Sequence, residues 1–294
     1  MEEAGVAATN PTDHPRGTHP PGDPPRQPAR HPRRMTRRNR TRLTRYGLYA
    51  FTIAVILVVA FTADWAKLQE SFFDPQVFAD LFPKILTVAA RNTIIFSVFG
   101  FSGGLALGLI LALMRLSSIR PYRWAAAVYI EVFRGLPALI TIFLIGYALP
   151  IALQVRVPGI YGPGSVALAL VTGAYLAETI RAGIEAVPKG QMEAARSLGM
   201  GYGRAMVSII IPQAFRVILP PLTNEWVLLI KDTSLLFVLG TTDETIELAK
   251  YGRDAVGKTF NATPLVAVAL VYLLITIPLT QLVAVLERRN KRAR

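Results

Sequence analysis

Residues 260–286 read FNATPLVAVALVYLLITIPLTQLVAVL, and none of them carries a charge. An α-helix needs about 20 consecutive apolar residues to cross the roughly 30 Å hydrocarbon core of a bilayer. A soluble domain has no use for so long an uncharged run, because its surface helices keep one polar side. This segment therefore predicts a membrane-spanning helix, and it sets the class of the whole chain.

Five more apolar segments of spanning length precede it. Working toward the N-terminus, they are Val217–Gly240, Val157–Ala177 with a helix beginning near Ser165, Trp124–Leu153, Asn92–Met114 and Tyr46–Ala63. The composition agrees, with 52% hydrophobic and only 17% charged residues. The sequence predicts an all-α integral membrane protein with about six transmembrane helices, and it excludes an ordinary soluble enzyme.

The net charge of +13 is concentrated at the two ends of the chain. Residues 1–45 hold ten Arg against four acidic residues, with eight of the 21 prolines, and residues 287–294 hold five basic residues against one acid. A Pro- and Arg-rich arm without apolar periodicity is expected to be disordered. Basic flanks keep the ends of membrane proteins in the cytoplasm beside anionic lipid. We therefore expect two cytoplasmic tails that contact membrane lipid and do not bind nucleic acid.

The hydrophobic part of the chain lacks the cysteine and histidine side chains that enzymes often use for catalysis. The chain has no cysteine, and its three histidines, His14, His19 and His31, precede the first span. We expect no catalytic residue and no metal site. The run from Gly252 to Thr259 matches the pattern of a phosphate-binding loop, but no buried strand precedes it, so we expect no ATP site there.

The longest loop on the expected cytoplasmic side contains Val187-Pro-Lys-Gly-Gln-Met-Glu-Ala-Ala-Arg-Ser-Leu-Gly199. Pro188 favours the start of a helix and Gly199 its end. Met192, Ala195 and Leu198 would share one side of that helix with Gly199, and this small-residue side suits insertion into a groove on a partner. The pattern alone equally allows an amphipathic connection at the lipid surface.

Glu193-Ala194-Ala195, followed by Gly199 and then by Ile211-Pro212, resembles the EAA signature of permease subunits of ATP-binding-cassette importers. Ala174-Tyr175-Leu176-Ala177-Glu178 and Lys231-Asp232-Thr233-Ser234-Leu235 resemble the branch that carries polar amino acids such as glutamate, glutamine, arginine and histidine. The resemblance implies a five-helix permease domain at residues 85–286. An extra N-terminal transmembrane helix and an outer loop would precede it at residues 46–84.

The resemblance also implies partners and residue roles. The partners are cytoplasmic ATPase subunits that bind ATP and Mg, an extracytoplasmic solute-binding protein, and a second permease subunit that is identical or a sister chain. No cofactor is implied on this chain, which would lie in the cytoplasmic membrane of a prokaryote. The residues assigned to ATPase coupling are Gly190, Gln191, Glu193, Ala194, Ala195, Gly199 and Pro212.

Charged residues inside a span cost about 2.5–3.5 kcal/mol each on insertion scales, so they need an explanation. The segment Val217–Gly240 carries Asn224, Glu225, Lys231, Asp232 and Ser234. Residues seven apart lie near one face of a helix, and a zwitterionic amino acid needs both donor and acceptor partners. We interpret these residues as the lining of a substrate path, with mutual neutralisation of the charges as the alternative.

Gly100, Gly104 and Gly108 form a stripe that favours close packing of two helices within lipid.

Two functions outside this family are compatible with a chain of this composition. One is a secondary transporter of small solutes driven by an ion gradient, which predicts internal repeats and proton- or sodium-exchanging carboxylates. The other is a membrane anchor that transports nothing, which leaves the charged fifth span without a purpose.

Overall fold

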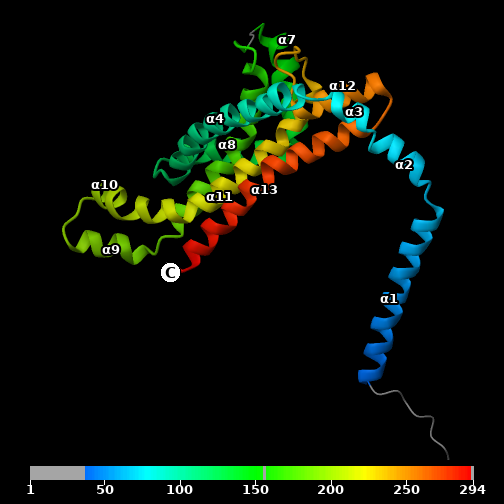
Figure 1. Cartoon of the computed structure of the whole chain (residues 1–294). Helices are drawn as coiled ribbons and strands as arrows, with labels where there is room; N and C mark the ends of the chain where they lie inside the picture. Colours follow the sequence, from blue (N-terminus) through cyan, green and yellow to red (C-terminus); the bar gives the residue numbers. More distant parts are fainter. Residues whose placement is uncertain (1–36, 155–156, 293–294) are drawn as a thin grey trace, which may run out of the picture. The chain divides into compact units, whose positions relative to one another are not determined.

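The computed structural model describes residues 37–154 and 157–292, and every regular element in those residues is helical (Figure 1). The α-helices are α1 (Arg37–Thr62), α2 (Trp65–Phe72), α3 (Pro75–Asp80), α4 (Arg91–Leu116), α5 (Arg120–Gly135), α6 (Ala138–Phe143), α7 (Leu149–Leu153), α8 (Gly162–Glu185), α9 (Lys189–Ser197), α10 (Tyr202–Ala205), α11 (Ile211–Asp232), α12 (Leu248–Thr259) and α13 (Thr263–Arg292). Three π-helical turns, η1 (Ile85–Ala90), η2 (Leu144–Ala148) and η3 (Met206–Ile210), and one 3-10 turn, η4 (Thr233–Val238), join them.

The helix α1 belongs to a compact unit of its own, residues 1–63, and residues 64–294 form the second unit. The stretch Thr44–Thr62 is apolar and long enough to cross a membrane, and none of it is buried. Residues 37–45, expected in the disordered tail, form the first turns of α1, while residues 1–36 lie outside the described part of the chain. At the other end, α13 continues to Arg292 and takes in most of the predicted tail 287–294.

The membrane spans predicted from apolar length are confirmed as helices. The spans in the second unit are Ile85–Leu116, Gly162–Glu185, Tyr202–Val238 and Thr263–Arg288, which with α1 make five helices of spanning length among the described residues. The fourth predicted span begins at Gly162, three residues before the expected Ser165. The fifth is longer than predicted, because α10, η3, α11 and η4 follow one another from Tyr202 to Val238.

The third predicted span, Trp124–Leu153, is not one straight helix. It consists of α5 followed by α6, η2 and α7, with a bend of 106° between the two halves. Pro137 causes the break, because proline lacks an N–H and disfavours the helical conformation for the residue before it. Leu136 accordingly has φ −86° and ψ 139°, in the extended region. A sixth crossing therefore exists if this bent pair is counted as one span.

The helices α4 and α8 lie against each other along their length (Figure 1), and small residues set their separation. A Cβ added to Gly100, Gly104 or Gly108 would lie 3.0, 3.1 or 2.9 Å from a Cβ of Leu168, Thr172 or Leu176 on α8. The glycine stripe thus packs inside one chain. Packing of this kind replaces the hydrophobic effect as the force that associates helices in lipid.

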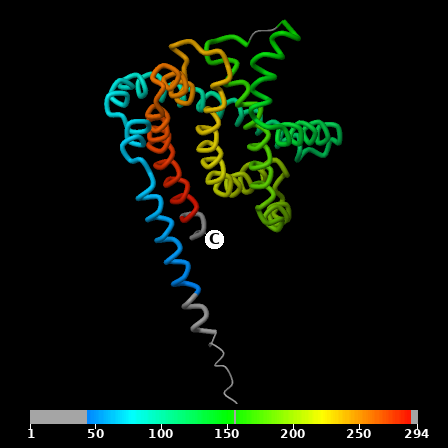
Figure 2. The backbone as a smooth tube through the Cα atoms, turned by 90° about the vertical axis from the view of Figure 1, so that its right-hand side faces the viewer, coloured from blue at the N-terminus to red at the C-terminus, as the bar shows by residue number. Residues whose placement is uncertain are grey.

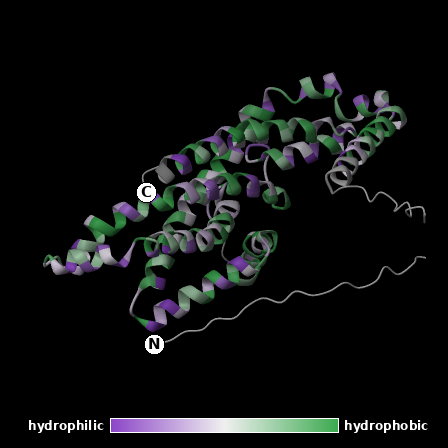
Figure 3. Ribbon diagram, turned by 90° about the horizontal axis from the view of Figure 1, so that it is seen from below, coloured by the Kyte–Doolittle hydropathy of each residue, from purple (hydrophilic) through white to green (hydrophobic). Residues whose placement is uncertain are grey.

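The helix α11 runs beside α8 on one side and α13 on the other, as Figures 1 and 2 both show. At the end where α8 begins, α12, η1 and the start of α13 enclose an apolar cluster that includes Leu81, Ile85, Leu248 and Val268. The long helices are mostly apolar along their length, with hydrophilic residues toward helix ends and connections (Figure 3). We call the end of the second unit where α8 begins the pocket end, because the pocket described below opens there. The opposite end, where α9 and α10 form a helical hairpin, is the hairpin end.

Candidate functional site

The segment from Val187 to Ile210 forms a helical hairpin between α8 and α11. Pro188 caps the start of α9, and its fixed φ of −56° suits that position. Gly199 follows the end of α9 with φ +80°, a conformation that glycine adopts without a Cβ clash. The chain then returns through α10 and η3. The helix α9 thus begins after Pro188 and ends before Gly199, as the sequence predicted.

The hairpin turns part of the predicted small-residue side of α9 inward, at Met192 and Ala195, while Leu198 and Gly199 stay exposed. Ala195 is only 2% exposed and Met192 packs on the cluster of Val187, Ile210 and Ala214. The expectation that this side enters a partner therefore does not hold for Ala195, which is covered by the hairpin's own second arm. The reason is that the chain folds back after Gly199, so the side of α9 that meets the second arm is packed closely and closed to a partner.

The opposite side of α9 carries the other residues that the sequence assigned to coupling. Gly190, Gln191, Glu193 and Ala194 are exposed, and Leu198 at the tip of the hairpin is 85% exposed. Leu198 is therefore open to contact with another molecule. Pro212, by contrast, lies in the first turn of α11, where it starts the long helix.

Side-chain hydrogen bonds stiffen the hairpin. The Arg196 Nη1 donates to the Met200 carbonyl oxygen over 2.9 Å, which closes the turn around Gly199. The Gln213 Nε2 donates to the Ile209 carbonyl oxygen over 2.9 Å and to the Gln191 Oε1 over 3.5 Å. The Gln191–Gln213 bond is the one among these three that joins α9 to the start of α11.

The polar residues of α11 divide between two sides of the helix. Asn224 and Lys231 are exposed, while Glu225, Asp232 and the following Ser234 are partly buried. The Glu225 and Asp232 carboxyls repel each other electrostatically, and Lys231 attracts Asp232. The structure thus brings hydrogen-bond acceptors and a cation together on one spanning helix. They lie in the second half of the continuous helix 202–238, away from α9.

Arg134 joins this group, and the sequence did not predict it. Its guanidinium carbon lies 5.6 Å from the centre of the Tyr175 ring, and its charge reaches the Glu225 carboxyl. The bend after Gly135 leaves Arg134 at the end of α5, where it meets Tyr175 of α8. The only sequence signal was an unexplained Arg beside Gly135 and Pro137.

An ion-pair network closes the hairpin end of α8. The Arg181 Nη2 lies 2.7 Å from the Glu178 Oε2, and its Nη1 lies 2.6 Å from the Glu185 Oε2. The Arg115 Nε, at the end of α4, lies 3.9 Å from the Glu178 Oε1. The pair of Glu178 with Arg181 within α8 thus extends to a neighbouring helix, α4.

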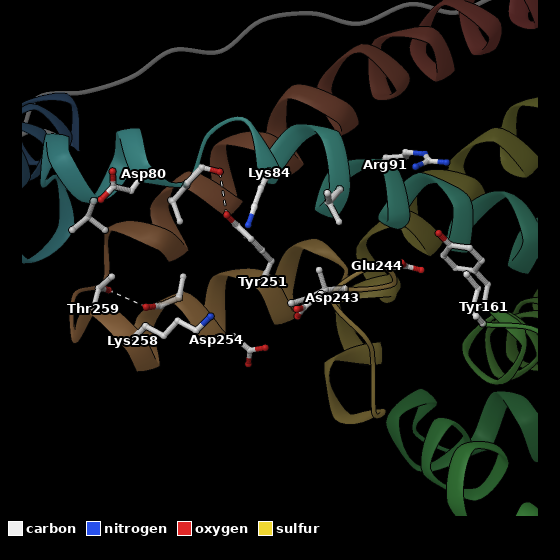
Figure 4. Close-up of a pocket in the computed structure, with 16 residues that line it drawn as sticks. Asp80, Lys84, Arg91, Tyr161, Asp243, Glu244, Tyr251, Asp254, Lys258 and Thr259 are labelled. Carbon is white, nitrogen blue, oxygen red and sulfur yellow. Dashed lines mark hydrogen bonds between the residues drawn. The ribbon is translucent and has the colours of Figure 1, made fainter.

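A pocket of about 800 Å³ opens at the pocket end between α3, α4 and α12 (Figure 4). Its charged lining residues are Asp80, Lys84, Arg91, Asp243, Glu244, Asp254 and Lys258. Residues 252–259, which match the phosphate-loop pattern, lie in α12 and use their backbone for helical bonds. Among the described residues, no group of three or more His, Cys, Asp and Glu side chains is arranged to hold a metal ion.

A buried polar network holds this end together. The Asn92 Nδ2 donates to the carbonyl oxygens of Glu244 and Ile246 over 2.7 and 2.9 Å. Glu247 is fully buried, and its carboxylate accepts from the backbone N–H groups of Ala249 and Lys250, both over 2.6 Å. Burial raises the pKa of Glu247 to about 7, against the opposing effect of those two bonds.

Comparison with known proteins identifies the family. The family model described as "Binding-protein-dependent transport system inner membrane component" matches residues 104–292. The chain is 39% identical over 204 residues to the "Probable glutamine ABC transporter permease protein GlnM" of Bacillus subtilis, covering 69% of this chain and 91% of that one. It is 36% identical to the "Arginine transport system permease protein ArtQ" of the same species, covering 64% and 84%.

Among solved structures, the fold resembles one titled "Crystal structure of an amino acid ABC transporter with histidines". The TM-score is 0.66 and the identity 35%, and the match covers 74% of this chain and 98% of the other. The hairpin and the EAA residues lie within residues 104–292, which the family model matches. The chain therefore belongs to the inner membrane components of binding-protein-dependent transport systems, and it is the permease subunit of an ATP-driven amino acid importer.

Proposed function

We propose that this permease carries a polar amino acid of the glutamate, glutamine, arginine and histidine class, as one of two permease subunits. The relatives are named for glutamine and arginine, and the similar solved structure for histidines. The polar side chains of α11 supply donors and acceptors suited to the α-amino and α-carboxylate groups that all these substrates share. The chain performs no bond chemistry in this proposal, and ATP and Mg bind to separate subunits.

The observation that carries the coupling proposal is the uncovered side of α9. Its exposed residues, Gly190, Gln191, Glu193 and Ala194, together with Leu198 at the tip, form a small uncovered surface that we assign to contact with an ATPase. Gly199 and Ala195 shape the hairpin, and Pro212 starts the helix that receives the motion. Movement of the ATPase would pass through the Gln191–Gln213 contact to α11.

The substrate path in this proposal runs along α11, with Asn224, Glu225, Lys231, Asp232 and Ser234. Arg134 and Tyr175 extend it, since their contact lies beside Glu225. Each charge on this path has a partner of opposite sign nearby. A zwitterion could exchange with such a partner at small electrostatic cost.

We infer the orientation of the chain in the membrane from the distribution of its basic residues. With both chain ends in the cytoplasm, 23 basic residues face inward and seven outward, and the hairpin end faces the ATPase. The pocket end would then face outward, toward the solute-binding protein. In this orientation the chain would lie in the cytoplasmic membrane of a prokaryote, with its mixed-charge pocket at the surface where substrate arrives.

The test is uptake of labelled glutamate, glutamine, arginine and histidine in a strain that lacks this gene. Complementation uses the natural chain, Ala194→Asp on the outward side of α9, or Ser118→Asp. Ser118 is also exposed on the expected cytoplasmic side but lies outside the hairpin, so it adds the same charge as a matched control. We expect uptake of one of these amino acids to require the gene. The rate of that uptake should fall at least tenfold with Ala194→Asp and should persist with Ser118→Asp.

Two outcomes would contradict the proposal. Full uptake with Ala194→Asp, at an equal membrane level of protein, would remove the outward side of α9 from the coupling surface. Uptake by membrane vesicles that needs an ion gradient but no ATP would point to the secondary transporter instead.

A further inference from the structure

The short helix α2 has one apolar and one polar side. Trp65, Leu68 and Phe72 are spaced three and four residues apart, so they share one side of the helix, and Lys67 and Glu70 point away from it. Trp65 is 56% exposed, and Leu68 and Phe72 are exposed as well. The chain therefore leaves open the side of α2 that would be buried in an ordinary soluble domain.

Three hydrogen bonds fix α2 and the residues after it to the start of α13. The Asn261 Nδ2 donates to the Glu70 carbonyl oxygen over 2.7 Å, and the Ala262 N–H donates to the Ser71 carbonyl oxygen over 2.8 Å. The Asp74 N–H donates to the Thr263 Oγ1 over 3.0 Å. The position of α2 is thus determined by the position of the helix that begins at Thr263.

The helix α13 defines the level of the membrane boundary beside α2. The span of α13 begins at Thr263, directly after the residues that hold α2. The helix α2 thus lies at the start of the α13 span, and its apolar side is exposed there, as are Leu265 and Leu270 on α13.

Phe260 adds a second observation at the same boundary. It is 92% exposed and adopts the left-handed conformation, with φ 53°, one residue before Asn261. A bulky residue in this conformation is uncommon and costs energy. Packing within the chain does not compensate for this cost, because the ring is almost fully open, whereas an aromatic ring gains energy at the lipid–water interface.

We infer that α2 lies flat in the lipid–water interface of the bilayer, with Trp65, Leu68 and Phe72 immersed at the acyl-chain boundary and Phe260 beside them. The partner is lipid, because Trp and Phe on the apolar side of a short amphipathic helix match an interface between headgroups and acyl chains. Bound in this way, α2 fixes the depth of α13 and of the pocket end in the membrane. The inference goes beyond the proposed function and does not depend on the substrate.

The natural tryptophans allow a direct test, because the chain has only Trp65, Trp124 and Trp226. The full chain with Trp124→Phe and Trp226→Phe is reconstituted in phosphatidylcholine and phosphatidylglycerol vesicles, and fluorescence of Trp65 is measured. Lipids brominated near the headgroup should quench it more strongly than lipids brominated near the bilayer centre. Aqueous iodide should quench it several-fold less than it quenches free tryptophan.

A matched pair of variants separates the two sides of α2. In a background that also carries Trp65→Phe, Leu68→Trp should be quenched by shallow brominated lipids, and Lys67→Trp should be quenched by iodide. Equal behaviour of the two positions would overturn the inference. So would quenching of Trp65 by iodide alone, or iodide quenching that is relieved when the solute-binding protein is added, since that protein would then be the partner of the apolar side. Thermal unfolding of each variant in detergent checks that the fold is retained.

Discussion

At single residues, the contact between α4 and α8 depends on the missing side chain at Gly108. A Cβ there would lie 2.9 Å from the Leu176 Cβ, 3.0 Å from the Gly173 carbonyl oxygen and 3.1 Å from the Ala177 nitrogen. Two of these atoms belong to the backbone of α8, so no side-chain rotation can relieve the clash.

Gly108→Ala should therefore destabilise the protein by about 1–3 kcal/mol, the usual cost of forcing extra atoms into a packed contact. The measurement is the midpoint of thermal unfolding in detergent. Gly47→Ala in α1 is the control, because a Cβ at that position meets nothing within 4 Å and alanine favours a helix. Equal midpoints for Gly108→Ala and the natural chain would show that the two helices separate freely at this point.

Glu247 links stability to pH. Its pKa is about 7 in the folded chain and near 4.5 ordinarily, with Tyr272 and Lys250 as its titratable neighbours. Between those pH values the folded state binds more protons, so the free energy of unfolding falls as pH rises from about 4.5 to 7. The full effect is at most about 3 kcal/mol, from 1.36 kcal/mol per pKa unit.

Glu247→Gln should abolish this dependence, because the neutral amide does not titrate. Its oxygen can still accept a hydrogen bond from the start of α12. The midpoint of thermal unfolding, measured from pH 5 to pH 8, should fall for the natural chain and remain nearly flat for the variant. A variant that keeps the same slope would assign the pH dependence to other groups.

At the scale of elements, the bend of 106° between α5 and α6 distinguishes the third crossing from the others. A straight helix from Tyr122 to Ile151 would be about 43 Å long at 1.5 Å per residue. The chain has no cysteine, so spin labels attached to Tyr122→Cys and Ile151→Cys report this distance alone. Both positions are exposed.

We expect a distance well short of 43 Å between these labels in the natural background. The control pair Leu265→Cys and Val285→Cys on the unbroken α13 should give about 30 Å, the length of 20 helical residues. Pro137→Ala should lengthen the first distance. A distance near 43 Å without that substitution would show that the third crossing is straight.

The sequence predicted elements well where one physical requirement controls them. Apolar length alone located the spans of α1, α4, α8, α11 and α13, because a bilayer demands the same length of every helix. Pro188 and Gly199 marked the ends of α9 for an equally local reason. The inward side of α9 and the contact of Arg134 with Tyr175 were not predicted, because each depends on residues of another helix or on the angle of a bend.

At the scale of the whole molecule, the bent pair decides on which side of the membrane the hairpin lies. If α5 to α7 cross the membrane, the loop at Ser118 and the hairpin at Ser197 share one side, and Asp243 at the pocket lies on the other. If the pair enters and leaves on the same side, Ser118 and Ser197 lie on opposite sides. The excess of basic residues on one side favours the first arrangement.

Single cysteines distinguish the two arrangements, because no natural cysteine interferes. Ser118→Cys, Ser197→Cys and Asp243→Cys are each exposed positions. In intact cells, a maleimide that cannot cross the membrane should label only Asp243→Cys, and in opened membranes it should label all three. Labelling of Ser197→Cys in intact cells would place the hairpin outside, away from any cytoplasmic ATPase. The coupling surface proposed for α9 would then have no partner, so this experiment tests the topology and the mechanism together.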